Sequence, residues 1–399
     1  MILMFLLLTM LVSKTNCWYQ DCVINGTIVE KGERNGLPTY QVIKKIFDLY
    51  QRPFTVLDIG AAQGFFSFMT AYDYEATCVM VEGDYDYQNH TTKLCELCEK
   101  NTELDKIIFL KKLVDLDFLK NLSDCEHFDV TLALNFVHHS GLDWQKTIDF
   151  LVEMGDNLIL ENPPHNELNI TQLDVHMRKN IDLYMEKLGA VVIGEVETNR
   201  VSKNLIKSKI WWLHKPKKRL KRRHIYWPPP SHMNYIDDGK YHLINSDFTK
   251  KELIKKIDPV EIKSPWINGI NMVTFLSFNG AYPTKELILS EVDRLKTEQV
   301  HDWGLANMIL TGNKITLIDR QDFACQAAYK NLADFIYSKI PLNSVIYWHL
   351  NQNLPDINKI LYLHKKITAS TYRKKQALRY KIININIAQK HKCLCQKNT

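Results

Sequence analysis

The segment 54–66, FTVLDIGAAQGFF, limits the possible fold of this chain more than any other stretch of it. A short apolar run ends at Asp58, and glycines follow at Gly60 and Gly64. Glycine adopts the backbone conformations of tight turns and lets the main chain approach a ligand closely. The pattern therefore predicts a buried strand, a ligand-binding loop, and a helix whose N-terminus faces the ligand.

A second apolar run, residues 78–82, ends in another acid, Glu82. An acid at the end of the second strand can accept hydrogen bonds from both ribose hydroxyls of a bound adenosine. The dinucleotide-binding fingerprint needs a further glycine at position 65, where this chain has Phe65. The spacing thus disfavours NAD and favours another cofactor that contains a nucleoside.

Further apolar runs predict the rest of a mostly parallel sheet. We expect strands at 106–113, 128–134 and 157–161, and an antiparallel pair at 190–196 and 209–213. Asp115 lies just beyond the first of these strands, Asn135 follows the second, and Glu161 ends the third. In an open parallel sheet, ligands bind in the crevice beyond the carboxyl ends of the strands. We therefore expect these side chains at the same edge as Asp58 and Glu82.

The pattern Asp58-x-Gly60-x-Ala62-x-Gly64, together with Glu82, resembles the S-adenosylmethionine (SAM) site of class I methyltransferases over residues 40–216. Ala62 stands where the middle glycine of that motif is common. The resemblance implies an α/β fold with a Rossmann-like seven-stranded sheet, and SAM as cofactor. The cofactor-binding residues that it implies are Asp58, Gly60, Ala62, Gly64, Glu82, Asp115 and Asn135.

Two adjacent histidines, His138 and His139, follow the strand 128–134 at the same predicted edge. Either ring can exchange a proton near neutral pH and can contact a methyl acceptor or its phosphate. They are the candidate catalytic residues of the first half. Because adjacent side chains on a regular element do not face one point, we expect one of them to act, and the alternative is that they only order the loop.

The second half contains an aspartate, an asparagine and a later aspartate at the spacing of a kinase catalytic loop. This pattern assigns proton acceptance to Asp302 as a catalytic residue, and Mg²⁺ binding to Asn307 and Asp319, with ATP as the substrate. The glycine-rich loop of kinases is missing, and Lys240, Lys250 and Lys251 are the available candidates for their ATP-binding lysine. The alternative is an unrelated α/β domain.

In motif order, the chain resembles the bifunctional enzymes that terminate bacterial polymannose O-antigens by phosphorylating a terminal sugar and methylating the phosphate. The resemblance implies methyl transfer to a phosphate- or hydroxyl-bearing glycan or lipid-linked sugar, and a smaller α+β kinase-like domain. Two alternatives stay open: an RNA methyltransferase and a catalytically inactive binding or scaffold protein. RNA would bind the basic run 214–224, which contains seven Lys or Arg residues.

The chain has 399 residues, 45% of them hydrophobic and 24% charged, which is an ordinary globular composition with room for two domains. We expect an apolar N-terminal segment at 1–18, a methyltransferase domain at 19–216, a basic linker at 217–230, a truncated kinase-like domain at 231–360 and a basic tail at 361–399. Nine scattered cysteines favour a reducing compartment. We expect a cytoplasmic enzyme, and two alternatives stay open for its apolar N-terminus: a signal-like segment or an anchor to a membrane surface.

Overall fold

The computed structural model of this chain describes residues 18–83, 90–101, 103–164, 171–197, 207–216, 219–220, 242–257, 260–297 and 308–317. The chain divides into two compact units, Met1–Ile340 and Pro341–Thr399. All the described residues belong to the first unit. The predicted kinase residues Asp302, Asn307 and Asp319 lie outside the described residues, so their roles stay predictions.

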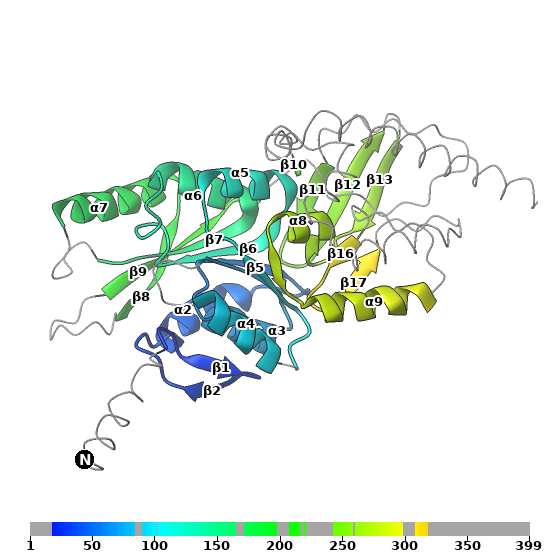
Figure 1. The fold of residues 1–399 in the computed structure, drawn as a ribbon. Coiled ribbons are helices and arrows are strands. Elements are labelled where there is room, and N and C mark those ends of the chain that lie inside the picture. The colour runs from blue at the N-terminus through cyan, green and yellow to red at the C-terminus, as the bar shows by residue number, and fades with distance from the viewer. Residues whose placement is uncertain are drawn as a thin grey trace, which may run out of the picture. The chain divides into compact units, whose positions relative to one another are not determined.

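The centre of the first unit is a mixed, mostly parallel sheet of eight strands in the order β15-β5-β4-β3-β6-β7-β9-β8 (Figure 1). In chain order these strands are β3 (Thr55–Ile59), β4 (Thr77–Glu82), β5 (Ile107–Lys111), β6 (Phe128–Leu134), β7 (Gly155–Asn162), β8 (Val191–Glu197), β9 (Lys207–His214) and β15 (Gly280–Tyr282). Strands β3 to β7 are parallel to one another, whereas β8, β9 and β15 pair antiparallel with their neighbours. The strand order reverses at β3, which is where doubly wound sheets bind their ligands.

Helices cover both faces of this sheet (Figure 1). One apolar core includes residues of α2 (Leu37–Phe47), α3 (Phe65–Tyr74) and α4 (His90–Lys100). The other includes residues of α5 (Leu116–Cys125), α6 (Trp144–Met154) and α7 (Gln172–Lys187). The two faces explain the unbroken apolar runs of the central strands: Leu57 belongs to one core and its neighbour Val56 to the other.

The seven predicted strands are all present as β3 to β9, and the sheet has an eighth strand, β15, which comes from the second half of the chain. Gly280 pairs with Leu110 of β5, and Tyr282 pairs with Phe109. This short strand satisfies main-chain groups on the outer side of β5 that would otherwise form an open sheet edge. Three residues are too few to show a strand period in the sequence, so β15 could not be recognised there.

The other described residues of the second half form two small antiparallel sheets and two helices. Their bounds are β10 (Arg219–Leu220), β11 (His242–Ser246), β12 (Lys251–Ile257), β13 (Val260–Pro265), β14 (Ile270–Asn271), α8 (Met272–Ser277), α9 (Lys285–Thr297), β16 (Met308–Leu310) and β17 (Ile315–Leu317). The sheet orders are β10-β11-β12-β13 and β14-β16-β17. Ile270, Phe275 and Met308 belong to the same apolar core as α5 and α6. The described second half therefore packs on the large sheet, while its kinase-like character and the boundary at 216 stay predictions.

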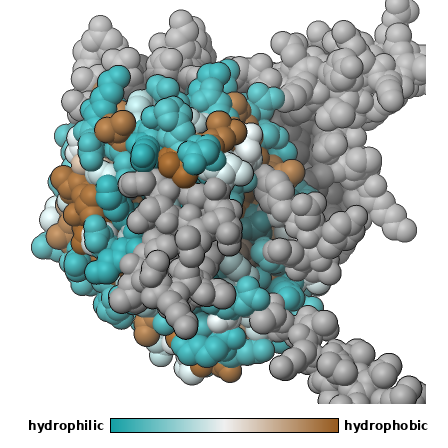
Figure 2. Space-filling model, turned by 90° about the vertical axis from the view of Figure 1, so that its left-hand side faces the viewer, coloured by the Kyte–Doolittle hydropathy of each residue, from teal (hydrophilic) through white to brown (hydrophobic). Residues whose placement is uncertain are grey.

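Figure 2 shows one face of the molecule, on which hydrophobic residues form small separate groups within a mostly hydrophilic surface. Among the described residues, the exposed large apolar side chains include Leu173 and Leu183 of α7 and Val191 and Val192 of β8. None of the helices in the described part of the chain combines the length and apolar character needed to cross a bilayer.

Candidate functional site

The loop between β3 and α3 is tightly turned and rests on the end of β4. Gly60, Ala62 and Gly64 have positive φ angles of 73°, 51° and 76°. The amides of Gly60 and Ala61 both donate to the carbonyl of Val81, at 2.9 and 3.2 Å. Ala62 thus takes the left-handed conformation that a middle glycine would adopt more easily. The loop presents its main chain at the carboxyl end of β3, as the sequence predicts.

Position 64 favours glycine for two reasons: its positive φ angle, and the lack of room for a side chain there. A Cβ atom at this position would lie 2.8 Å from the sulfur of Met80 and 2.8 Å from a ring carbon of Phe68. Both neighbours belong to the packed core. The first turn of α3 can therefore approach β4 this closely only with glycine at position 64.

Glu82 ends β4 and is held by main-chain amides. Its Oε2 accepts a hydrogen bond from the amide of Ala62 at 2.8 Å, and its Oε1 accepts one from the amide of Gly83 at 2.9 Å. Only 8% of Glu82 is exposed. An ionised carboxylate only accepts hydrogen bonds, and it has about four acceptor positions. The loop after β3 and the acid after β4 thus form one connected unit.

A cavity of about 420 Å³ lies at the carboxyl ends of β3, β4 and β6. Its size is within the usual range of roughly 300 to 1,000 Å³ for small-molecule sites. The residues that line it are Tyr19, Gln20, Arg34, Gly60, Ala62, Val81, Glu82, Gly83, His90, Val114, Leu134, Asn135, Phe136, His139 and Ser140. The structure thus brings Gly60, Ala62, Glu82, Asn135 and His139 of the predicted site residues together around one cavity.

Asp58 is not among the residues that line the cavity. It is buried, and it accepts a hydrogen bond from the Ser67 hydroxyl at 2.8 Å. Burial raises the pKa of Asp58 to about 6, although the Ser67 hydrogen bond and the charge of Arg34 act in the opposite direction. In this geometry Asp58 joins β3 to the first turn of α3 and so stabilises the loop between them.

Asp115 caps helix α5 instead of lining the cavity. Its Oδ1 accepts a hydrogen bond from the amide of Phe118 at 2.6 Å, and its Oδ2 lies 3.4 Å from the Lys112 ammonium. The preceding residue, Val114, lines the cavity. The predicted contact of Asp115 with the cofactor stays a prediction, and the structure shows a helix cap at that position.

The two adjacent histidines differ in position. Their ring centroids are 3.9 Å apart, with the planes tilted by 44°. His139 lines the cavity and is exposed, whereas His138 is not among the lining residues. This geometry favours His139 as the one that faces a ligand.

Three lining residues, Tyr19, Gln20 and Arg34, come from the stretch before α2, which the sequence pattern does not connect to the site. Tyr19 stacks on His90 with ring centroids 6.2 Å apart. The side chain of Gln20 accepts a hydrogen bond from the amide of Phe65 at 3.3 Å. Arg34 donates to the Glu161 carboxylate at the end of β7, and its own amide donates to the carbonyl of Tyr19 at 2.8 Å. The regular elements of this stretch are two short paired strands, β1 (Cys22–Ile24) and β2 (Thr27–Glu30). They are too short to show a period in the sequence, so nothing there marked these contacts.

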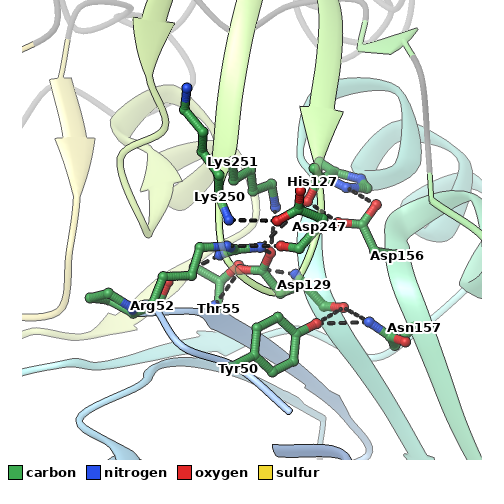
Figure 3. A network of polar contacts seen from close by, with 12 residues as sticks. Tyr50, Arg52, Thr55, His127, Asp129, Asp156, Asn157, Asp247, Lys250 and Lys251 are labelled. Carbon is green, nitrogen blue, oxygen red and sulfur yellow. Dashed lines mark hydrogen bonds and ion pairs between the residues drawn. The ribbon is translucent and has the colours of Figure 1, made fainter.

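A second polar cluster lies at the opposite, amino-terminal end of the same strands (Figure 3). Asp129 is fully buried and accepts hydrogen bonds from Arg52 at 2.6 Å, from Lys251 at 3.0 Å and from the amide of Thr55 at 2.7 Å. Burial alone would raise the pKa of Asp129, but the charges of Lys251 and Arg52 outweigh it and lower the pKa. Lys251, a candidate for an ATP-binding lysine, is thus paired inside the protein.

Asp156, at the start of β7, belongs to the same cluster. Its two oxygens contact His127 Nε2 at 2.9 Å and the Ser246 hydroxyl at 2.7 Å. The pKa of Asp156 is lowered, because the charge and hydrogen bond of His127 together with Lys251 outweigh its burial. Strands β11 and β12 are therefore attached to the large sheet by buried polar contacts, on the side away from the cavity.

No family model and no curated protein matches the chain. Among solved structures, WbdD in complex with a kinase inhibitor aligns over 94% of this chain and 99% of its own, at 15% identity and a TM-score of 0.40. The N-terminal domain of EvdMO1 with S-adenosylhomocysteine (SAH) and D-fucose covers 52% of this chain and 96% of its own, at 9% identity and a TM-score of 0.37.

A SAM-dependent methyltransferase from Aquifex aeolicus covers 44% of this chain and 90% of its own, at 15% identity and a TM-score of 0.32. All three similarities are too distant to carry an argument about function. The proposal below therefore rests on the residues around the cavity.

Proposed function

We propose that this chain is a SAM-dependent methyltransferase. The observation that carries the proposal is the arrangement of Glu82, which is buried at the wall of the cavity and held by the amide of Ala62. The sequence associates two features with a nucleoside: the glycine-spaced turn and the acid at the end of the next strand. Both features line the same cavity. They lie where the strand order of the sheet reverses, which is the usual ligand site of such folds.

The lining residues fit the cofactor chemically. Glu82 offers carboxylate oxygens to the ribose hydroxyls, and the positive φ angle of Gly60 lets the main chain come close to the ligand. Val81 and Val114 provide apolar surface for the adenine ring. When bound, SAM supplies a methyl group on a positively charged sulfur, which is the electrophile of the reaction.

The residues of the chain contribute mainly by positioning. Methyl transfer needs a nucleophile held in line with the methyl group and close to it, so orientation supplies much of the rate. His139 is placed at the cavity to accept a proton from a hydroxyl acceptor or to donate a hydrogen bond to a phosphate. Tyr19 and Gln20, from the stretch before α2, line the cavity and reduce the access of water to it.

The acceptor in this proposal is a phosphate- or hydroxyl-bearing glycan or lipid-linked sugar. The order of the sequence motifs supports it, from the Asp58 to Gly64 turn to the histidine pair and the kinase-like spacing after it. A phosphotransferase activity with Mg²⁺ and ATP stays a prediction, because Asp302, Asn307 and Asp319 lie outside the described residues. An RNA methyltransferase and an inactive binding protein are the alternatives.

Calorimetry with SAM and with SAH tests the proposal. The wild-type chain should bind both. Glu82→Ala should weaken binding by roughly 100-fold, because hydrogen bonds to a charged group contribute about 1.5 to 3 kcal/mol each. Glu82→Gln keeps the side-chain volume and should also weaken binding. Glu99→Ala, an exposed change on α4, is the matched control and should have no effect.

The alternatives give other outcomes. Absence of SAM and SAH binding by the folded wild-type chain would contradict the methyltransferase proposal and favour an inactive binding protein. Salt-sensitive retention of RNA, together with SAM binding, would favour an RNA acceptor.

A further inference from the structure

The wall of the cavity that contains Glu82 is supported by β5, which is a neighbour of a strand from the second half of the chain. In the large sheet, β5 lies between β4 and β15. In its register with β4, Lys111 is opposite Glu82. The next amide, that of Lys112, donates to the main-chain carbonyl of Glu82 at 2.9 Å. The carboxyl end of β5 therefore holds the main chain of the acid on which the proposed function depends.

The two residues that follow, Leu113 and Val114, connect the end of β5 to the cavity. The main chain of Leu113 packs directly on Gly83, because a Cβ atom at position 83 would lie only 2.5 Å from the Cα atom of Leu113. The amide of Gly83 in turn donates to Oε1 of Glu82 at 2.9 Å. Val114 itself lines the cavity. A displacement of residues 112–114 would therefore move both the Glu82 carboxylate and the apolar surface of Val114.

Asn279, from the second half, holds the same strand end on its outer side. It lies between α8 and β15. Its main-chain carbonyl accepts a hydrogen bond from the amide of Lys111 at 3.1 Å, and its side-chain Nδ2 donates to the carbonyl of Lys111 at 3.0 Å. Asparagine suits this position because it tolerates the positive φ of 58° better than most residues and also provides a side-chain donor. Asn279 thus binds both main-chain groups of Lys111.

These contacts form a continuous connection from the second half to the cavity. Asn279 binds Lys111, the next amide binds the main chain of Glu82, and the residues after it reach Gly83 and the cavity. Protein interiors are packed too closely to absorb a displaced strand end without moving its neighbours. The sequence pattern ends the methyltransferase domain at 216, so it assigns no residue of the second half to this site.

We propose that Asn279 is a positioning residue of the candidate methyltransferase site, which holds the end of β5 so that Glu82 and Val114 face the nucleoside of the cofactor. The inference rests on the proposed function and extends the site into the second half of the chain. Asn279 is exposed and is not among the residues that line the cavity. Its effect on binding is therefore exerted through β5 and not through contact with the ligand.

The test is calorimetry of the full chain with two probes, SAH and 5′-methylthioadenosine, which share the thioadenosine part and differ in the amino-acid end. Asn279→Asp keeps the size of the side chain but replaces its donor by an acceptor, which would face the carbonyl of Lys111. The affinity for both probes should fall by the same factor, roughly fivefold, as expected for the loss of one ordinary hydrogen bond. The factors should be equal because Glu82 and Val114 face the part that the probes share.

Two further variants complete the test. Asn279→Gly retains the positive φ and the main-chain carbonyl and removes only the side-chain donor, so it should weaken both probes by a smaller factor, roughly twofold. Lys314→Met is the matched control. Lys314 is another exposed residue of the second half, and its ammonium lies 2.6 Å from Asp105, which precedes the opposite end of β5. This variant should leave both affinities unchanged.

Four outcomes would overturn an assignment. Unchanged affinities in Asn279→Asp would show that Asn279 does not set the end of β5. Weakening of SAH alone would show that the effect reaches the amino-acid end of the ligand and not Glu82 and Val114. Equal weakening in Lys314→Met would show a general loosening of the second half. Failure of the wild type to bind either probe would overturn the proposed function itself, and this result differs from the other three.

Discussion

The ammonium of Lys251 lies 3.0 Å from a carboxylate oxygen of Asp129, and both side chains are almost completely buried. The pair joins β12 of the second half to β6 of the large sheet. Lys251 also lies over the ring of Trp266, 4.1 Å from its centroid. Burial lowers the pKa of Lys251, although the charge of Asp129 counteracts this effect. The ion pair thus makes the second half part of the folded core around the candidate site.

Replacement of Lys251 by Met should lower the free energy of unfolding by about 3 kcal/mol. Breaking a buried ion pair costs about 3 to 5 kcal/mol when it leaves a charge uncompensated. The lower end applies here, because Arg52 would still be bonded to Asp129. Chemical denaturation measures the change. Lys250→Met is the matched control, because Lys250 is an exposed neighbour paired with Glu252, and it should change stability by less than about 0.5 kcal/mol. Equal stability of the two variants would contradict the role of the pair.

Gly64→Ala should destabilise the fold and abolish binding of SAH. The new methyl group would meet Met80 and Phe68 at 2.8 Å, in addition to the strain of a positive φ angle. Gly141→Ala separates these two effects, because Gly141 has a φ of 66° but no atom within 4 Å of the place that a Cβ would occupy. We expect Gly141→Ala to cost about 1 kcal/mol and Gly64→Ala roughly 1 to 3 kcal/mol more. Thermal unfolding and calorimetry give the two quantities, and similar costs for both variants would argue against the clash.

Asp58→Asn should change how stability depends on pH. The pKa of Asp58 is raised from 3.8 to about 6 in the folded chain, so the native state binds the proton more tightly than the unfolded state does. Stability from this group is therefore present below about pH 4 and is lost as pH rises through 6. The loss is on the order of 3 kcal/mol. Asparagine does not titrate and can still accept the hydrogen bond of Ser67.

Denaturation of both forms at pH 4 and at pH 7 checks this expectation. The variant should gain stability relative to the wild type between the two pH values, because only the wild type loses the contribution of Asp58. A difference between variant and wild type that is the same at both pH values would show that Asp58 titrates normally.

Asp115→Ala should weaken the fold without weakening SAH binding. Loss of a helix N-cap costs about 1 kcal/mol, and the Asp115 side chain does not line the cavity. Asp143→Ala removes the corresponding cap of α6 and should have a similar cost. Denaturation and calorimetry with SAH measure the two effects. A tenfold loss of SAH affinity in Asp115→Ala alone would instead support the contact with the cofactor that the sequence resemblance implies.

The sequence contained enough information to predict the centre of the fold. The run that ends at Asp58 is β3, the run that ends at Glu82 is β4, and the apolar pair at 190–196 and 209–213 is the antiparallel pair β8 and β9. Strands β3 and β4 are recognisable because all their residues are buried, and burial on both faces of a sheet makes a strand mostly apolar. The tight turn of the loop follows from its glycines, because glycine adopts positive φ angles readily, whereas the positive φ of Ala62 is not specified by its residue type.

Other features depend on contacts between distant residues and could not be read from the sequence. Arg34 donates to Glu161, which is 127 residues away in the chain, and its amide donates to the carbonyl of Tyr19. Lys251 has the same local sequence character as Lys250, yet one is buried and the other exposed. Asp115 follows a strand as a ligand-binding acid would, but it also precedes a helix, and the helix cap determines its position. For Arg34 and Lys251 the partner lies in another element, and local pattern does not specify it.

The pairing of Gly280 and Tyr282 with β5 has a consequence for the order in which the chain is synthesised and folded. Strand β5 is made long before β15, so a nascent chain that has produced β3 to β9 still exposes an unpaired edge on its largest sheet. That edge can be closed only after residues 280–282 have left the ribosome. An expression fragment that stops before them would carry the same open edge permanently, and such edges promote aggregation.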